Sequence, residues 1–127
     1  MQDSPSMSSQ DTRSLIAQAI DQFTAEVPAL KNLKLVIRLE LRAHGGDVPI
    51  WRVELPGPKI AKEPAADARV DVSIGRPEFN QLVAKGHLKD WATAYDRGQL
   101  RVSGDDGVIR LVGQVVQRQM ARGQQLA

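Results

Sequence analysis

Few residues in this chain could do acid–base or metal chemistry. Its two histidines, His44 and His87, each stand beside a glycine in an expected loop, where a solvated imidazole is the usual state. Cysteine is absent, so disulfide bonds and thiolate chemistry are excluded. We therefore predict no metal site and no catalytic histidine.

The strongest candidate for paired-carboxylate chemistry is Asp105 with Asp106, inside the sequence GDDG. Asp is also a favoured helix N-cap, and an amphipathic run begins at Val108, so we predict that one of the pair caps that helix. The segment lacks the lysine of a phosphate-binding loop, and Ser73 and Ser103 lack the context of a nucleophile elbow. The sequence thus predicts no catalytic residue, no cofactor and no enzyme activity.

Two aromatic residues, Trp91 and Tyr95, stand four positions apart and share one face of an expected helix. This spacing is typical of ordinary core packing, and it equally fits side chains that line an apolar cavity. Spacing alone leaves both interpretations open.

The bulk composition is that of one soluble globular domain. The chain has 127 residues, of which 42% are hydrophobic and 25% are charged. Aromatic residues make up only 4%, which argues against a nucleic-acid partner, because such surfaces need several stacking rings. The expected compartment is the reducing cytoplasm.

The net charge is +2, from 17 basic and 15 acidic residues that are interleaved along most of the chain. After Asp106, however, Arg110, Arg118 and Arg122 have no acidic neighbours. They are either a solvated helix face near a C-terminus or a transient contact with an anionic membrane surface.

The first half of the chain predicts one helix and four strands. Residues 1–10 are polar and Ser-rich, which favours a disordered tail. Apolar residues at helical spacing predict a helix from Asp11 or Thr12 to about Val27, where Pro28 ends it, followed by a short linker. The expected strands are residues 33–43, 50–55, 59–62 and 69–74, with a turn at 44–47 that joins the first two as an antiparallel hairpin, and another at 63–67.

The second half predicts helix, helix, strand, helix. Pro77 suits the first turn of a helix that stops at Gly86, and a second helix runs from Leu88 to Gly98. Residues 100–103 alternate as a strand, and the final helix begins at Val108. Gly113 inside that helix either allows close packing or helps it to bend or move. We take 11–122 as a single domain and 123–127 as a tail.

Three segments of this pattern resemble the sterol carrier protein type 2 domain family: VDVSI, then RPEFNQLVAKG, then AYDRGQLRVSGDDGVIRLV. The position of Trp51 near the start of its strand is also similar, and the resemblance covers about Asp11 to Gln119. It implies an α+β fold with a five-stranded, mainly antiparallel sheet and four to five helices packed on one face. It further implies an apolar tunnel between sheet and helices that holds a fatty acyl chain, acyl-CoA, sterol or phospholipid without catalysis.

On this resemblance we expect ten residues to line the tunnel, with the final helix as its lid and Arg110 placed to meet an anionic head group. They are Phe79, Leu82, Val83, Trp91, Tyr95, Val102, Val108, Leu111, Val112 and Val115. The alternative is an accessory or dimerisation module that presents the apolar groove to a partner protein or to a second copy of the chain. The shortage of Phe favours this module over sterol carriage.

Overall fold

The computed structural model describes residues 9–43 and 48–126, with side chains over 11–43 and 48–122. The helices are α1 (Ser9–Glu26), the 3₁₀ helix η1 (Pro28–Asn32), α2 (Arg76–Lys85), α3 (Leu88–Asp96) and α4 (Asp106–Leu126). The strands are β1 (Leu35–Arg42), β2 (Ile50–Leu55), β3 (Lys59–Ala61), β4 (Val70–Gly75) and β5 (Leu100–Gly104). The predicted turn at 44–47 and residues 1–8 of the predicted N-terminal tail lie outside the described residues, whereas residues 123–126 of the predicted C-terminal tail continue α4.

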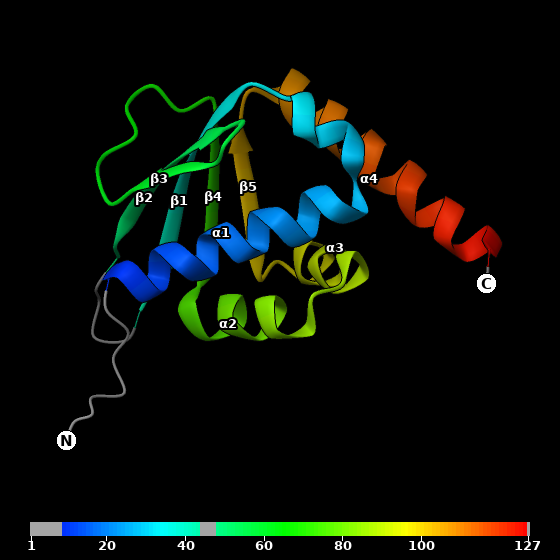
Figure 1. Ribbon diagram of the computed structural model, residues 1–127, viewed down its shortest axis with the longest axis horizontal. Helices are drawn as coiled ribbons and strands as arrows, with labels where there is room; N and C mark the ends of the chain where they lie inside the picture. The colour runs from blue at the N-terminus through cyan, green and yellow to red at the C-terminus, as the bar shows by residue number, and fades with distance from the viewer. Residues whose placement is uncertain (1–8, 44–47, 127) are drawn as a thin grey trace.

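The strands form one sheet in the order β3-β2-β1-β4-β5. Every neighbouring pair is antiparallel except β1 with β4, which is parallel. The helices α1, α2 and α3 cover one face of this sheet (Figure 1). The predicted α+β class, with a mainly antiparallel five-stranded sheet and helices packed on one face, is confirmed among the described residues.

Alternating residues build the inner face of the sheet, as the sequence pattern requires. Leu39 and Leu41 of β1 stand opposite Trp51 of β2 and Ile74 of β4, and all four are buried. Together with side chains of α1, α2 and α3 they form the main cluster, which is the hydrophobic core of the sheet–helix interface. Each fully buried side chain of this size contributes about 1.5–3 kcal/mol relative to its exposed state.

The junction between α2 and α3 is held by α1. Gln22 donates a hydrogen bond from Nε2 to the carbonyl of Val83 over 3.0 Å. Glu26, one turn further along α1, accepts a 2.8 Å bond from the N–H of Leu88, which is one of the unpaired donors at the start of α3. Helices α2 and α3 are therefore joined to α1 by hydrogen bonds as well as by apolar packing.

A second cluster lies beside the main one. Its buried members are Val27, Leu30 and Leu88, and the half-buried residues Val112, Val115, Val116 and Met120 of α4 pack against it. The segment after Pro28, predicted as a linker, forms the helix η1. This helix places Leu30 in the second cluster. The long helix α4 therefore flanks the β5 edge of the sheet and projects beyond it (Figure 1), and does not lie over the main cluster.

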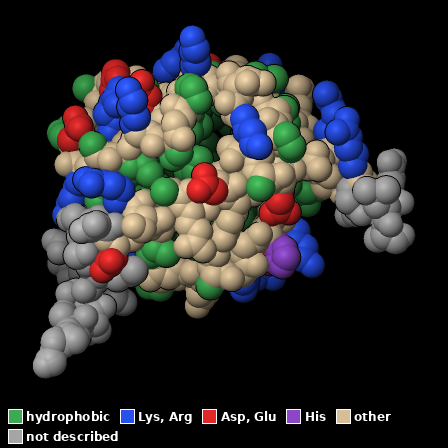
Figure 2. All heavy atoms as spheres, in the orientation of Figure 1, with side chains coloured by type: hydrophobic (Ala, Val, Ile, Leu, Met, Phe, Trp, Pro, Cys, Tyr) green, Lys and Arg blue, Asp and Glu red, His purple; other side chains and the backbone are tan. Residues whose placement is uncertain are grey.

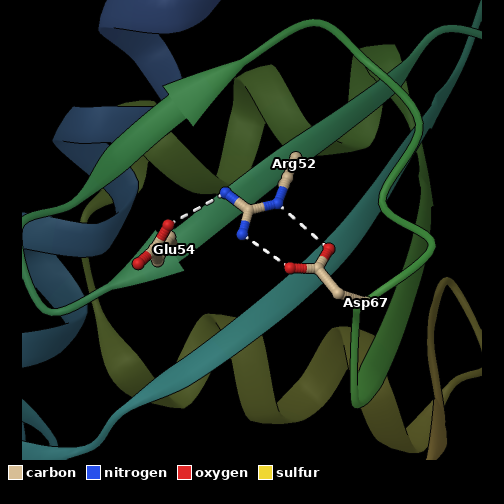
Figure 3. A network of polar contacts seen from close by, with 3 residues as sticks. All are labelled: Arg52, Glu54 and Asp67. Carbon is tan, nitrogen blue, oxygen red and sulfur yellow. Dashed lines mark hydrogen bonds and ion pairs between the residues drawn. The ribbon is translucent and has the colours of Figure 1, made fainter.

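The outer face of the sheet is mostly charged. Arg52 donates from Nε and Nη2 to the two carboxylate oxygens of Asp67 over 3.1 and 2.7 Å, and from Nη1 to Glu54 over 2.9 Å (Figure 3). These bonds lower the pKa of Asp67 and tie the loop before β4 to the sheet. This charged face offers no surface that a large apolar ligand could bind. The apolar face of the sheet is the inner one.

Candidate functional site

An apolar hollow opens on the inner face of the sheet. Figure 2 shows hydrophobic side chains at the bottom of a depression in front of the sheet, above α1 in the orientation of Figure 1. Six inward-facing strand residues remain half-buried: Ile37, Leu55, Ile60, Val72, Leu100 and Val102. All of them except Val102 also pack against the main cluster, so the helices cover this part of the inner face only partly.

The sheet register explains how these residues come together. Val72 of β4 stands directly opposite Val102 of β5, and on its other side opposite Leu39 of β1. Ile37, two residues before Leu39, lies on the same face one row further along β1. The half-buried side chains therefore form a band that runs obliquely across the sheet, between the part covered by α1 and the part beside α4.

The predicted lining residues of α2 and α3 pack into the main cluster. Phe79, Leu82 and Val83 are buried there. Trp91 is half-buried, and its ring meets those of Phe23 and Phe79 edge-to-face at centroid distances of 6.4 and 6.1 Å. These four residues are part of the wall that supports the inner face, since protein side chains already surround them.

The remaining predicted residues are distributed over three environments. Tyr95 is 50% exposed and Leu111 is 52% exposed. Val112 and Val115 pack on the second cluster, and Val108 at the start of α4 is half-buried. Val102 is the member of the predicted set that lies in the band across the inner face.

Ile37 and Val72 were missed by the sequence reasoning, although a signal for them exists. Both alternate with polar residues along their strands, so their inward orientation could be predicted. Their incomplete coverage could not, because it depends on how α4 packs against Val27 and Leu30, which lie more than eighty positions earlier in the chain.

The polar candidates are placed as follows. Asp105 is the N-cap of α4: its Oδ1 accepts a 3.2 Å bond from the N–H of Val108, which confirms the predicted cap. His87 is exposed, and His44 lies outside the described residues. Within the described ranges no three His, Cys, Asp or Glu side chains gather as metal ligands. The indole N–H of Trp51 is buried without a hydrogen-bond partner.

A second concave region lies between η1 and α4. It is an open groove of about 330 Å³. Its lining residues are Val27, Pro28, Ala29, Val115, Arg118, Gln119 and Arg122. Of the predicted lining set, Val115 alone belongs to it, so this groove and the inner-face hollow are separate features of the surface.

Among the described residues, none of the helices combines the length and apolarity that a bilayer crossing requires. Even α4, the longest, carries three arginines.

Comparison with known proteins gives a consistent answer at the level of fold. No family model matches the sequence, and no curated protein shows a significant match. Among solved structures, a palmitated sterol carrier protein 2-like 2 from Aedes aegypti is 22% identical with a TM-score of 0.55, over 80% of this chain and 93% of that one.

Two further structures have the same fold. Sterol carrier protein 2 from Yarrowia lipolytica, in its apo form, is 17% identical with a TM-score of 0.53, over 85% of this chain and 88% of that one. The sterol carrier protein domain 2 of Helicoverpa armigera is 12% identical with a TM-score of 0.59, over 91% and 94%. The predicted sterol-carrier-protein-2-like fold is thus confirmed.

Proposed function

We propose, from a fold of the sterol carrier protein 2 type, that this chain is a non-catalytic carrier that binds a fatty acyl chain in the inner-face hollow. The observation that carries the proposal is the band of half-buried apolar side chains on the central strands, with Val72 and Val102 opposite one another. An apolar surface left open in the middle of a sheet is the surface that a hydrophobic ligand would complete.

Simple transfer energetics support such a ligand. Each CH₂ group moved from water to an apolar surface gains about 0.8 kcal/mol. A chain of a dozen or so methylenes therefore gains enough to offset the cost of immobilisation with no polar anchor. The hollow needs no reactive group for this kind of binding.

A slim ligand suits the site better than a broad one. The relative from Aedes aegypti is described as palmitated, which supports an acyl chain as the ligand here. Trp91 and Phe79 already pack edge-to-face in the sheet–helix interface, so a rigid polycyclic ligand entering that interface would need them to move. We assign the walls to Ile37, Val72 and Val102, and the supporting layer to the predicted residues of α2.

Substitutions on β5 offer a matched test, because successive strand residues point to opposite faces. Val102→Phe fills the hollow with an apolar ring, whereas Ser103→Phe adds the same ring to the outer face. Titration with a fluorescent fatty acid should show saturable one-to-one binding that Val102→Phe weakens at least about tenfold, an amount equivalent to ~1.4 kcal/mol. Equal affinities in the two variants would refute the hollow as the binding site.

A second candidate function is self-association through α4, in keeping with the accessory or dimerisation module. Leu111, half-exposed on a helix that projects from the body, favours it. Light scattering of the wild-type chain and of Leu111→Asp distinguishes the two: a dimer that the substitution dissociates supports the module. A monomer that still binds fatty acid supports the carrier.

A further inference from the structure

The groove between η1 and α4 has a polarity gradient along its length. Val115, Arg118 and Arg122 of α4 line the groove, and Leu111, one turn before Val115, continues the same helix face just beyond it. Leu111 and Val115 are apolar, whereas Arg118 and Arg122 are cationic. Opposite them, Pro28 and Ala29 of η1 add small apolar walls, and the buried Val27 forms part of the floor.

The two arginines in the groove are not matched by acidic side chains. Among the residues whose side chains the structure describes, none forms an ion pair with Arg118 or Arg122. Two cations at i and i+4 of a helix repel one another. An oxyanion between them would relieve that repulsion and accept charge-assisted hydrogen bonds from both guanidinium groups.

The stretch of α4 from Leu111 to Arg122 is about 16 Å long, at 1.5 Å per residue. A ligand that matches it has an apolar chain at one end and a compact anion at the other. We propose that this groove binds an anionic single-chain amphiphile, a fatty carboxylate or an alkyl phosphate, with its head group between Arg118 and Arg122 and its chain along Val115 toward Leu111.

This site goes beyond the carrier function proposed above, because it lies outside the hollow and shares none of its residues. It would capture an amphiphile at the surface by charge, whereas the hollow selects by apolar contact alone. Either site can exist without the other, so each can be tested separately.

The test is a titration of the full chain with dodecyl phosphate, kept below its critical micelle concentration. Binding is monitored through the backbone amide NMR signals of Val115 and Gln119. Arg118→Gln with Arg122→Gln should weaken saturable binding at least about tenfold, as expected when charge-assisted bonds are lost. The matched control is Arg97→Gln with Arg101→Gln, which removes the same charge from exposed positions outside the groove. It should leave the affinity within about twofold.

Two more ligands and one variant separate the alternatives. Dodecyl maltoside has the same chain without charge, and inorganic phosphate has the charge without the chain; both should bind far more weakly than dodecyl phosphate. Val102→Phe should leave the signals of Val115 and Gln119 as responsive as in the wild type. Equal weakening by both arginine pairs, equal binding of the maltoside, or the absence of saturable shifts at Val115 would overturn the proposal.

Discussion

Arg69 donates a hydrogen bond from Nη2 to Oδ2 of Asp105 over 2.6 Å, and the N–H of Asp105 donates in return to the carbonyl of Arg69 over 2.8 Å. Arg69, the residue before β4, is thereby joined to Asp105, the N-cap of α4. Since Asp105 also caps α4 through Val108, one side chain fixes both where β5 ends and where the last helix leaves the sheet.

The contribution of Asp105 to stability should depend on pH. The hydrogen bond from Arg69, and then that from Val108, lower its pKa in the folded chain, whereas an unfolded Asp titrates near 3.9. A lowered folded pKa means that the stabilisation is complete above about pH 5, a unit above the unfolded pKa, and is lost as the pH falls through the unfolded and then the folded value. We expect Asp105→Asn, which keeps a capping side chain, to be less stable than the wild type at pH 7.

Urea denaturation of both proteins between pH 7 and pH 3 checks this prediction. The difference in unfolding free energy should be constant down to about pH 5 and then shrink toward pH 3. Asp67, whose pKa is lowered in the same direction, is present in both proteins and cancels from the difference. A difference that stays constant to pH 3 would show that the charge on Asp105 contributes nothing.

Gly104 should not tolerate a side chain. Its φ is +120°, and a Cβ there would overlap the carbonyl oxygen of Arg69 and lie 3.0 Å from Cα of Val70. Gly104→Ala should therefore lower the free energy of unfolding by more than about 3 kcal/mol, which is the upper end of the cost of backbone strain alone. The matched control is Gly98→Ala, where φ is +78° but no heavy atom lies within 4 Å of the added Cβ.

Thermal and urea unfolding of these two variants separate strain from crowding. Gly98→Ala should lose about 1–2 kcal/mol, which is the cost of a left-handed conformation for an L-residue. If Gly104→Ala lowers the free energy of unfolding no more than Gly98→Ala does, the backbone at the end of β5 and at the start of β4 can move apart to admit the methyl group.

Gly113 should be replaceable with a gain in stability. A Cβ there would meet no heavy atom within 4 Å, so close packing does not explain the glycine. Gly113→Ala should stabilise α4 by about 0.5–1 kcal/mol through its higher helix propensity. Hydrogen exchange of the α4 amides should slow by up to about fivefold, which is that energy expressed as a ratio. Faster exchange would show that the glycine serves a contact or a bend.

Two of the predicted lining aromatics should behave in opposite ways. Phe79 is 3% exposed, so Phe79→Ala should cost about 3–5 kcal/mol. Tyr95 is half-exposed, and Tyr95→Ala should change the unfolding free energy by no more than about 0.5 kcal/mol. A large loss for Tyr95→Ala, measured by urea denaturation, would contradict its placement at the surface.

Local pattern was sufficient to find most elements. The strand Ile50–Leu55 has the predicted bounds, and the hairpin with β1 is antiparallel as expected. Helix α2 ends before Gly86, as the glycine signal indicates, but α1 begins at Ser9, two residues before the predicted Asp11. The differences lie at ends of elements, where fraying and capping alternatives are close in energy.

Long-range relationships were beyond the reach of periodicity. The parallel pairing of β1 with β4 and the ion pair between Arg52 and Asp67 both depend on the path of the loop that joins β3 to β4. The stripe of α2 is as typical of a core as of a cavity wall, and the pattern alone could not show that Phe79, expected to line a tunnel, lies in the main cluster. The broad apolar face of α4 did not indicate against which cluster this helix would pack.

The most direct test of a ligand in the inner-face hollow is methyl NMR on a chain with labelled Ile, Leu and Val side chains, titrated with palmitate. Our account predicts saturable shifts centred on the methyl groups of Ile37, Val72 and Val102, with Val36 on the outer face of β1 unchanged. Shifts confined to α4, or none at Val72 and Val102 when palmitate is in excess, would contradict it.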